Sequence, residues 1–387
     1  MSGPEHYSEA SRSTLPAATT PAQTAVRRRI EVEENDGIML SGMYKSLMSH
    51  IKTMASNRMF DFDNLDEKAK CRIVASMNNI LDLDDIAADG SYFSLGPEQQ
   101  DEIAALFEYT PSSLNIHREA DINSLLKRAH RNWNHAISML YSQIGKASDL
   151  EIATTYKIAV HLAEVHFEND NIFEHESSLS EADFIVKVWG HIIEKLFYKT
   201  NVFCRWGDTI SQTEANDYTS HRLDLRMLCK SNLSKYDICD GEFGKKAFPT
   251  KVYHDKVKLI MNGKNQLNYI LKNHSGELSE VKITLLQVLG FEADLYQMWL
   301  ERDGVYILKK IKHFAIPTIS RHFAQGMGEL LEGLSILRFS ALELAVICND
   351  DNKKIGRLQA VTNPSPNPAI NRSVPTRAVW IPPVNTA

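Results

Sequence analysis

Three acidic side chains on two neighbouring predicted strands could together hold a divalent metal ion. Asp224 lies in the β-like run 222–230, and Asp240 and Glu242 lie in the run 236–243. Side chains alternate along a strand, so Asp240 and Glu242 share one face, and pairing of the two runs would bring Asp224 close to them. Converging carboxylates repel one another unless a cation lies between them, and oxygen ligands suit Mg²⁺ or Mn²⁺. Such an ion activates water and stabilises charge on a phosphate.

The same residues also allow structural interpretations. Arg222 and Arg226 share a strand face with Asp224, so the three could form a solvated cross-strand ion cluster. Asp240 and the glycine that follows it could form a turn. The sequence leaves these alternatives open beside the metal site.

The elements around the acids predict a mixed α/β domain over residues 176–348. Ser180 with Asp183 is typical of a capping box at the start of a helix. Strands follow at 201–210, 222–230 and 236–243, then a helix at 252–271, strands at 285–301 and 305–316, and a helix at 320–347. Arg302-Asp303-Gly304 is the predicted turn between the last two strands. The order is α-β-β-β-α-β-β-α, a mixed β-sheet flanked by helices.

This order, together with the pieces SEADF at 180–184, DLR at 224–226 and GEFGK at 241–245, resembles the PD-(D/E)XK (restriction-endonuclease-like) nuclease superfamily. Longer stretches, SEADFIVKVWGHIIEKLF and GVYILKKIKHFAIP, are similar to an expanded family of fungal proteins. The resemblance covers roughly residues 175–345. It implies Asp224 and Glu242 as metal ligands, Lys245 near the attacked phosphate, Glu181 as an auxiliary acid, and Mg²⁺ or Mn²⁺ as the cofactor.

The sequence departs from the family pattern at Gly244, where the motif lysine is expected. Lys245 points to the opposite face of an ideal strand, although a bulge at Gly244 could turn it back. Asp240 and Glu242 could instead act as a D-x-E variant with Asp224. Two functions therefore follow. One is a metal-dependent nuclease, and the other is a catalytically inactive nuclease-like fold that serves as a binding or scaffold protein for a protein or nucleic-acid partner.

Basic residues gather after the acidic strand, which predicts a lysine-rich face that could hold a phosphate backbone. A solvated helix face is the alternative. The basic residues are Lys245, Lys246, Lys251, Lys256, Lys258, Lys264, Lys309, Lys310, Lys312, His313, Arg321 and His322.

The rest of the chain predicts two flexible ends and a helical lobe. Residues 1–36 are rich in Ser, Thr, Ala and Pro, and so is the tail 349–387, so neither buries enough apolar surface to fold alone. Residues 37–175 show helical spacing at 39–54, 65–81, 121–144 and 150–168, with a further helix beginning at Leu95-Gly-Pro97. We therefore expect an N-terminal all-helical lobe before the α/β domain.

Composition limits the partners and the compartment. The chain has 387 residues and a net charge of −6, so any nucleic-acid contact must come from a local patch. Its apolar stretches are shorter than the ~20 residues that cross a bilayer, which predicts no membrane insertion. Five scattered cysteines and a polar N-terminus favour a reducing intracellular compartment. The triplet Arg27-Arg28-Arg29 leaves nucleus and cytoplasm both open.

Overall fold

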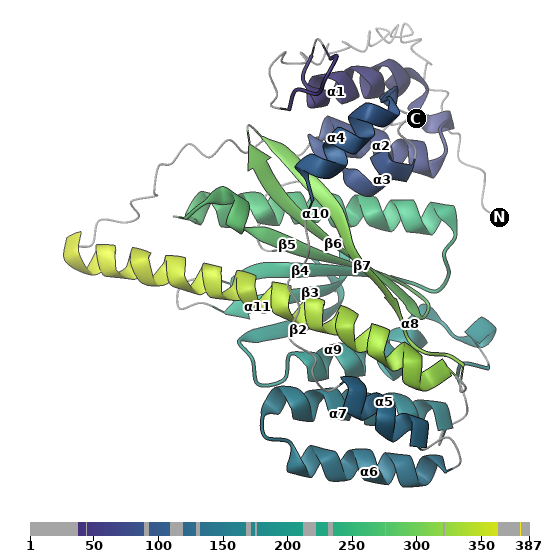
Figure 1. Ribbon diagram of the computed structural model, residues 1–387. Coiled ribbons are helices and arrows are strands. Elements are labelled where there is room, and N and C mark those ends of the chain that lie inside the picture. Colours follow the sequence, from purple (N-terminus) through teal and green to yellow (C-terminus); the bar gives the residue numbers. More distant parts are fainter. Residues whose placement is uncertain are drawn as a thin grey trace, which may run out of the picture. The chain divides into compact units, whose positions relative to one another are not determined.

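The computed structural model describes residues 38–43, 45–88, 93–108, 119–128, 132–167, 172–174, 176–211, 222–230, 235–274, 276–302, 304–319, 322–362 and 380 (Figure 1). The predicted N-terminal arm, residues 1–36, lies outside the described residues. The helices are α1 (Leu47–Arg58), α2 (Glu67–Met77), α3 (Leu83–Ala88), α4 (Pro97–Leu106), α5 (Glu119–Arg128), α6 (Trp133–Lys146), α7 (Leu150–Phe167), α8 (Glu181–Phe184), α9 (Gly190–Leu196), α10 (Pro249–Asn273) and α11 (Phe323–Thr362). Shorter helical segments are η1 (Met59–Asn64), η4 (Glu176–Ser178), η7 (Leu278–Glu280) and the π-helical η5 (Ile185–Trp189), which joins α8 to α9. The strands are β1 (Ile80–Asp82), β2 (Val202–Thr209), β3 (Leu223–Lys230), β4 (Lys235–Gly244), β5 (Lys282–Leu289), β6 (Glu292–Arg302) and β7 (Val305–Ala315).

The strands of the described ranges form one seven-stranded mixed sheet in the order β1-β7-β6-β5-β4-β3-β2. β2, β3 and β4 are an antiparallel meander, and β5, β6 and β7 are a second one. β4 and β5 are parallel, because α10 carries the chain back between them. The predicted mixed α/β sheet flanked by helices is therefore confirmed. In the part of the chain with assigned structure, we find no helix that combines the length and the apolar character needed to span a bilayer.

Two long helices cover opposite faces of the sheet (Figure 1). α10 covers the face that carries Asp240, whose Oδ1 accepts a hydrogen bond from Gln266 Nε2 at 3.0 Å. α11 covers the other face, where Gln297 Nε2 donates to Ser340 Oγ at 3.0 Å. Gln297 of β6 lies, through β5, in register with Cys239, the sequence neighbour of Asp240, so Gln297 and Asp240 project from opposite faces of the sheet.

The N-terminal half is mostly helical, but it also contributes a strand to the sheet, so an all-helical lobe over 37–175 is not what forms. β1 pairs in parallel with the start of β7, and Ile80 lies in register with Tyr306. The predicted helix at 65–81 ends at Met77, because Asn79 adopts a left-handed φ of 58° that turns the chain into β1. The predicted helix at 121–144 is two helices, since Asn132 caps α6 by accepting from the backbone N–H of His135 at 3.1 Å.

The C-terminal half departs from the predicted order at two places. The run 285–301 is not one strand but parts of β5 and β6, because Gly290 has a φ of 62° and begins a tight turn. The observed order is therefore α-β-β-β-α-β-β-β-α. The strands on either side of the predicted turn pair antiparallel, with Arg302 in register with Val305, and Asp303 of that turn lies outside the described residues. α11 continues to Thr362, so the predicted flexible tail begins as helix, and residues 363–379 and 381–387 lie outside the described residues.

Candidate functional site

Asp224 and Glu242 lie opposite each other on adjacent strands. Leu225 of β3 lies in register with Gly241 of β4, and continuing this antiparallel register by one residue places Asp224 across from Glu242. Residues that face each other across two strands project from the same side of the sheet. The Asp224 carboxylate is fixed at Oδ2 by the backbone N–H of Phe243 at 2.8 Å. The structure thus brings these two sequence-predicted acids together.

Glu242 is fully buried, and its two oxygens have different surroundings. Lys258 Nζ donates to Oε2 at 2.9 Å, whereas Oε1 accepts no hydrogen bond. Burial and then the negative charge of Asp224 raise the pKa of Glu242 to about 8, with Lys258 acting in the opposite direction. Burial also raises the pKa of Asp224, which is half-buried. The site therefore confines two carboxyl groups that favour a nearby positive charge.

The first turns of α10 present three charged side chains to this pair. Lys251, Asp255 and Lys258 are spaced four and three residues apart, so they share one face of the helix. Asp255 is only 1% exposed, with Lys251 Nζ 3.1 Å from Oδ2 and Lys258 Nζ 3.8 Å from Oδ1. Although burial opposes it, the negative charge of Asp255 raises the pKa of Lys251. The sequence predicts these lysines near the acids but indicates no role for Asp255. Its spacing of four residues from Lys251 and three from Lys258 could have indicated that it shares their helix face.

Gly244 occupies the position of the motif lysine, and the side chain of Lys251 fills the space beside it. A Cβ at Gly244 would lie 3.1 Å from Lys251 Cε and 3.0 Å from Leu289 Cδ2, which is tighter than most real Cβ contacts. The missing side chain therefore lets a lysine from α10 cross the end of β4. In the sequence, Gly244 stands where the motif lysine is expected. In the structure, the space beside Gly244 is occupied by Lys251 of α10.

Glu181 lies at the exposed margin of the site. Its carboxylate is 3.5 Å from Lys251 Nζ, and its side chain is 41% exposed. It occupies the first turn of α8, which the predicted capping box of Ser180 and Asp183 begins. An acid at this position also interacts favourably with the helix dipole. Glu181 thus contacts the same lysine that pairs with the buried Asp255.

Lys245 and Asp240 have other partners. Lys245 Nζ donates to the carbonyl of Ser177 at 3.0 Å, so it does not lie in hydrogen-bonding contact with Glu242. Asp240 is fully buried on the same face of β4 as Glu242, under α10, where its Oδ1 accepts from Gln266. The structure therefore separates Lys245 from the acids and places Asp240 one pleat along the strand from Glu242.

Arg226 does not neutralise Asp224, although the two share a strand face. Its Nη2 donates to both carboxylate oxygens of Asp237, at 2.7 Å to Oδ1 and 2.8 Å to Oδ2, and its Nε donates to Oδ1 at 3.0 Å. This pair is almost completely buried, with side-chain exposures of 6% and 3%. The predicted cross-strand ion cluster around Asp224 is therefore replaced by an Arg226–Asp237 pair, and Asp224 faces the lysines of α10 instead.

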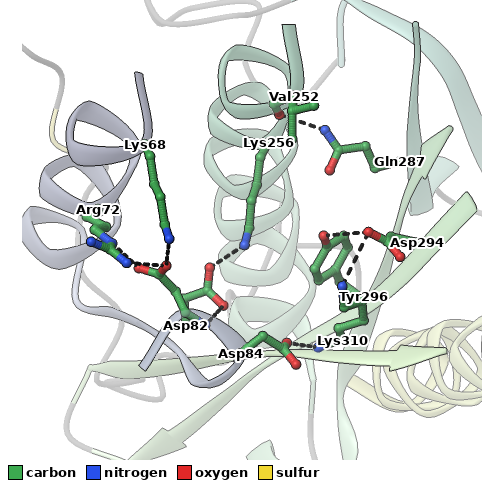
Figure 2. A network of polar contacts seen from close by, with 11 residues as sticks. Lys68, Arg72, Asp82, Asp84, Val252, Lys256, Gln287, Asp294, Tyr296 and Lys310 are labelled. Atoms are coloured by element: carbon green, nitrogen blue, oxygen red, sulfur yellow. Dashed lines mark hydrogen bonds and ion pairs between the residues drawn. The ribbon is translucent and has the colours of Figure 1, made fainter. Parts of the chain in front are cut away.

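Glu242 belongs to a row of polar side chains that crosses the sheet under α10. The strand registers place it beside Gln287, then Asp294, then His313. Gln287 Nε2 donates to the carbonyl of Val252 at 2.7 Å, and His313 Nδ1 lies 2.8 Å from Asp294 Oδ1. Figure 2 shows Gln287 reaching the backbone of α10 and Asp294 held between two further side chains. The polar row thus continues from the candidate site toward β7.

A second charged network ties α10 to the N-terminal helices. Figure 2 shows Lys256 of α10 bound to Asp82 at the end of β1. Close to this pair, Arg72 Nη2 of α2 donates to Asp85 at 2.8 Å, and Lys68 Nζ lies 3.8 Å from the same carboxylate. The Lys256–Asp82 pair therefore fixes α10 against β1, and the two pairs on Asp85 fix α2 against α3.

The basic residues do not form one exposed lysine-rich face. Lys256 is mostly buried in the network above, and Lys264 is fully buried in the core. Lys309 donates to the carbonyl of Phe107, so it too has an internal partner. Lys246 and His322 are exposed, and Arg321 lies outside the described residues. A nucleic-acid partner therefore stays a prediction, and the basic side chains that support it are Lys251 and Lys258 beside the acids.

Among the residues that the structure describes, no three His, Cys, Asp or Glu side chains form a ready-made metal-binding group. The candidate site offers two paired acids, with a third acid and two lysines around them. No protein-family model, curated protein or solved structure gives a significant match to this chain. The assignment of function therefore depends on the side-chain arrangement of this site.

Proposed function

We propose that this chain is a metal-dependent nuclease of the PD-(D/E)XK type, which hydrolyses phosphodiester bonds. The observation that carries the proposal is the cross-strand pair of Asp224 and Glu242, with the ammonium of Lys258 2.9 Å from the buried carboxylate. The sequence of elements from α8 to β5 is also the one that the resemblance implies. It consists of a helix, three antiparallel strands, a helix and a parallel strand.

The donor set fits Mg²⁺ or Mn²⁺. Asp224 and Glu242 offer only oxygen atoms, which hard divalent cations prefer, and Glu242 Oε1 is a buried acceptor without a hydrogen bond. Mg²⁺ is commonly held by one or two carboxylates together with water and substrate phosphates, so two protein acids suffice. When bound, the cation would supply an activated water and neutralise charge on the phosphate.

The lysines of α10 supply the positive charge that the motif lysine gives in the family. Lys258 is placed beside Glu242 by the helix rather than by β4, and Lys251 crosses the end of β4 over Gly244. Both ammonium groups can attract a phosphodiester and offset negative charge that develops on it. Asp255 pairs with both lysines, so it holds them toward the site and away from solvent.

The exposed side of the site is where a polynucleotide can approach. Glu242 and Asp255 are closed off from solvent, whereas Asp224 is half-buried and Lys251, Lys258 and Glu181 are partly exposed. A phosphate entering there would meet the lysines before it reached the acids. The chemistry fits the phosphodiester of DNA and of RNA equally, so both are test substrates.

One observation favours a second function, a nuclease-like binding protein without catalysis. The ammonium of Lys258 already compensates Glu242 in the way that a cation would. If this ion pair is permanent, the paired acids are a structural element, and the fold binds a protein or a nucleic acid without cleaving it.

A nuclease assay on linear DNA and on RNA, with Mg²⁺ or Mn²⁺, separates the two functions. We expect wild-type cleavage that chelation with EDTA abolishes. Asp224→Asn and Glu242→Gln should each lower the rate at least ~100-fold, and Lys258→Met should lower it by a factor on the order of 10–100. The matched control is Glu329→Gln, which changes an exposed acid on α11 and should cleave like wild type.

Cleavage at equal rates by wild type, Asp224→Asn and Glu242→Gln would reject the assignment of the acids. Absence of cleavage by the wild type on both substrates, with metal-independent binding of either one, would instead favour the binding protein. The two outcomes are distinguished by measuring binding and cleavage on the same labelled oligonucleotides.

A further inference from the structure

Trp380, near the C-terminal end of the sequence, is bound by a residue of the N-terminal half. Its backbone N–H donates to Asn78 Oδ1 at 2.8 Å, and Asn78 Nδ2 donates to its carbonyl oxygen at 3.0 Å. One side-chain amide therefore binds both backbone polar groups of a single residue. The Trp380 side chain packs against a buried apolar cluster of Ala55, Ile73 and Met77 on α1 and α2.

Asn78 is held in place by contacts that do not involve Trp380. It is 1% exposed at the end of α2, and its Nδ2 also donates to the carbonyl of Val74 at 2.9 Å. Lys264 of α10, which is fully buried, donates from Nζ to the Asn78 carbonyl at 2.8 Å and lies 3.3 Å from Oδ1. The amide is therefore oriented before a peptide arrives, which lowers the entropic cost of binding one.

We infer that Asn78 and the apolar cluster form a binding site for a tryptophan-containing peptide segment. The amide recognises peptide backbone, which any sequence provides, whereas the apolar cluster selects a large side chain. The occupant is the chain's own C-terminal segment, 374–387, with the sequence VPTRAVWIPPVNTA. Pro382 and Pro383 follow Trp380 closely and restrict the free segment, so less conformational entropy is lost on binding.

A segment tethered to its own site binds at a higher effective concentration than a free peptide. The site of the wild-type chain should therefore be filled by its own Trp380, and a free peptide should compete poorly. Removing Trp380 from the full-length chain should open the site to the same peptide added separately. This difference between two full-length proteins makes the inference testable without any enzymatic activity.

The experiment measures fluorescence anisotropy of a labelled peptide, residues 374–387, added to full-length proteins. We expect the peptide to bind Trp380→Ala at least ~10-fold more tightly than wild type. A control peptide with alanine in place of tryptophan should not bind. Adding Asn78→Asp to Trp380→Ala should weaken binding about tenfold or more, because the aspartate keeps an acceptor for Lys264 but lacks the Nδ2–H donor.

Two results would overturn the inference. One is equal binding of the peptide to wild type and to Trp380→Ala, including the absence of binding to both. The other comes from sedimentation velocity. A wild-type dimer that Trp380→Ala converts to a monomer would show that the segment occupies a second copy, whereas we expect both proteins to sediment as the same species. Circular dichroism of Asn78→Asp confirms that the variant is folded before its binding is interpreted.

Discussion

Replacing Glu242 by glutamine should make the metal-free protein more stable at alkaline pH. Burial and the charge of Asp224 raise the pKa of Glu242 from 4.5 to about 8, so the folded chain keeps a proton that the unfolded chain releases. A group with a raised folded-state pKa contributes its full stabilisation below pH 4.5 and loses it as the pH rises through 8. The free energy of unfolding of the wild type should therefore fall by up to about 1.4 kcal/mol per pH unit in this window.

The magnitude follows from the shift and from the partner of Glu242. The full pKa shift corresponds to roughly 4 kcal/mol at pH 8. This value already includes the opposing effect of Lys258, and the glutamine oxygen can still accept a hydrogen bond from the same ammonium. We expect Glu242→Gln to be more stable than wild type by about 4 kcal/mol at pH 8 and nearly equal to it at pH 5.

Urea denaturation followed by circular dichroism at pH 5, 6.5 and 8, in the presence of EDTA, gives both stabilities. Glu329→Gln serves as the control and should reproduce the pH dependence of the wild type. Parallel pH curves for Glu242→Gln and wild type would refute the reasoning, because Glu242 would then be ionised in the folded protein throughout this range. A buried acid that costs stability is typical of a site kept for function.

Three further predictions follow from the same contacts. Gly244→Ala should displace Lys251, whose Cε lies 3.1 Å from the added Cβ, and lower the cleavage rate about tenfold while circular dichroism shows a retained fold. Arg226→Met should lower the free energy of unfolding by about 3–5 kcal/mol in a urea titration, because it leaves the buried Asp237 unpaired; a loss below 1 kcal/mol contradicts this. The affinity for Mn²⁺ should rise up to about tenfold per pH unit below pH 8, since Glu242 must release its proton, and a pH-independent affinity measured by calorimetry would contradict this.

The alternation of side chains along the strands predicted the acidic part of the site from the sequence. It placed Asp224 and Glu242 on one sheet face, because a two-residue period and a hairpin are local properties of the chain. The lysine could not be placed in the same way. Lys258 lies on the following helix, and its distance from Glu242 depends on how α10 packs on β4, which no local pattern records. For the same reason, the glycine at position 244 looked like the loss of the motif lysine, because the sequence does not show that Lys251 of α10 lies beside it.

The fold was predictable where elements are long and separated by clear turns. The helix at Ser180 and the strands β2, β3 and β4 have strong local signals, namely a capping box and alternation. β1 has only three residues, and its apolar side chains continue the helical spacing of α2, so only its pairing with β7 reveals it as a strand. The turn at Gly290 was hidden inside an unbroken apolar run.

The central claim is that Asp224 and Glu242 together bind a divalent cation, and calorimetric titration of the metal-free protein with Mn²⁺ at pH 8 measures this directly. We predict one saturable site per chain in the wild type and in Glu329→Gln, with heat of binding lost in Asp224→Asn and in Glu242→Gln. A wild-type protein that takes up no Mn²⁺, or variants that bind it as well as the wild type, would contradict the claim.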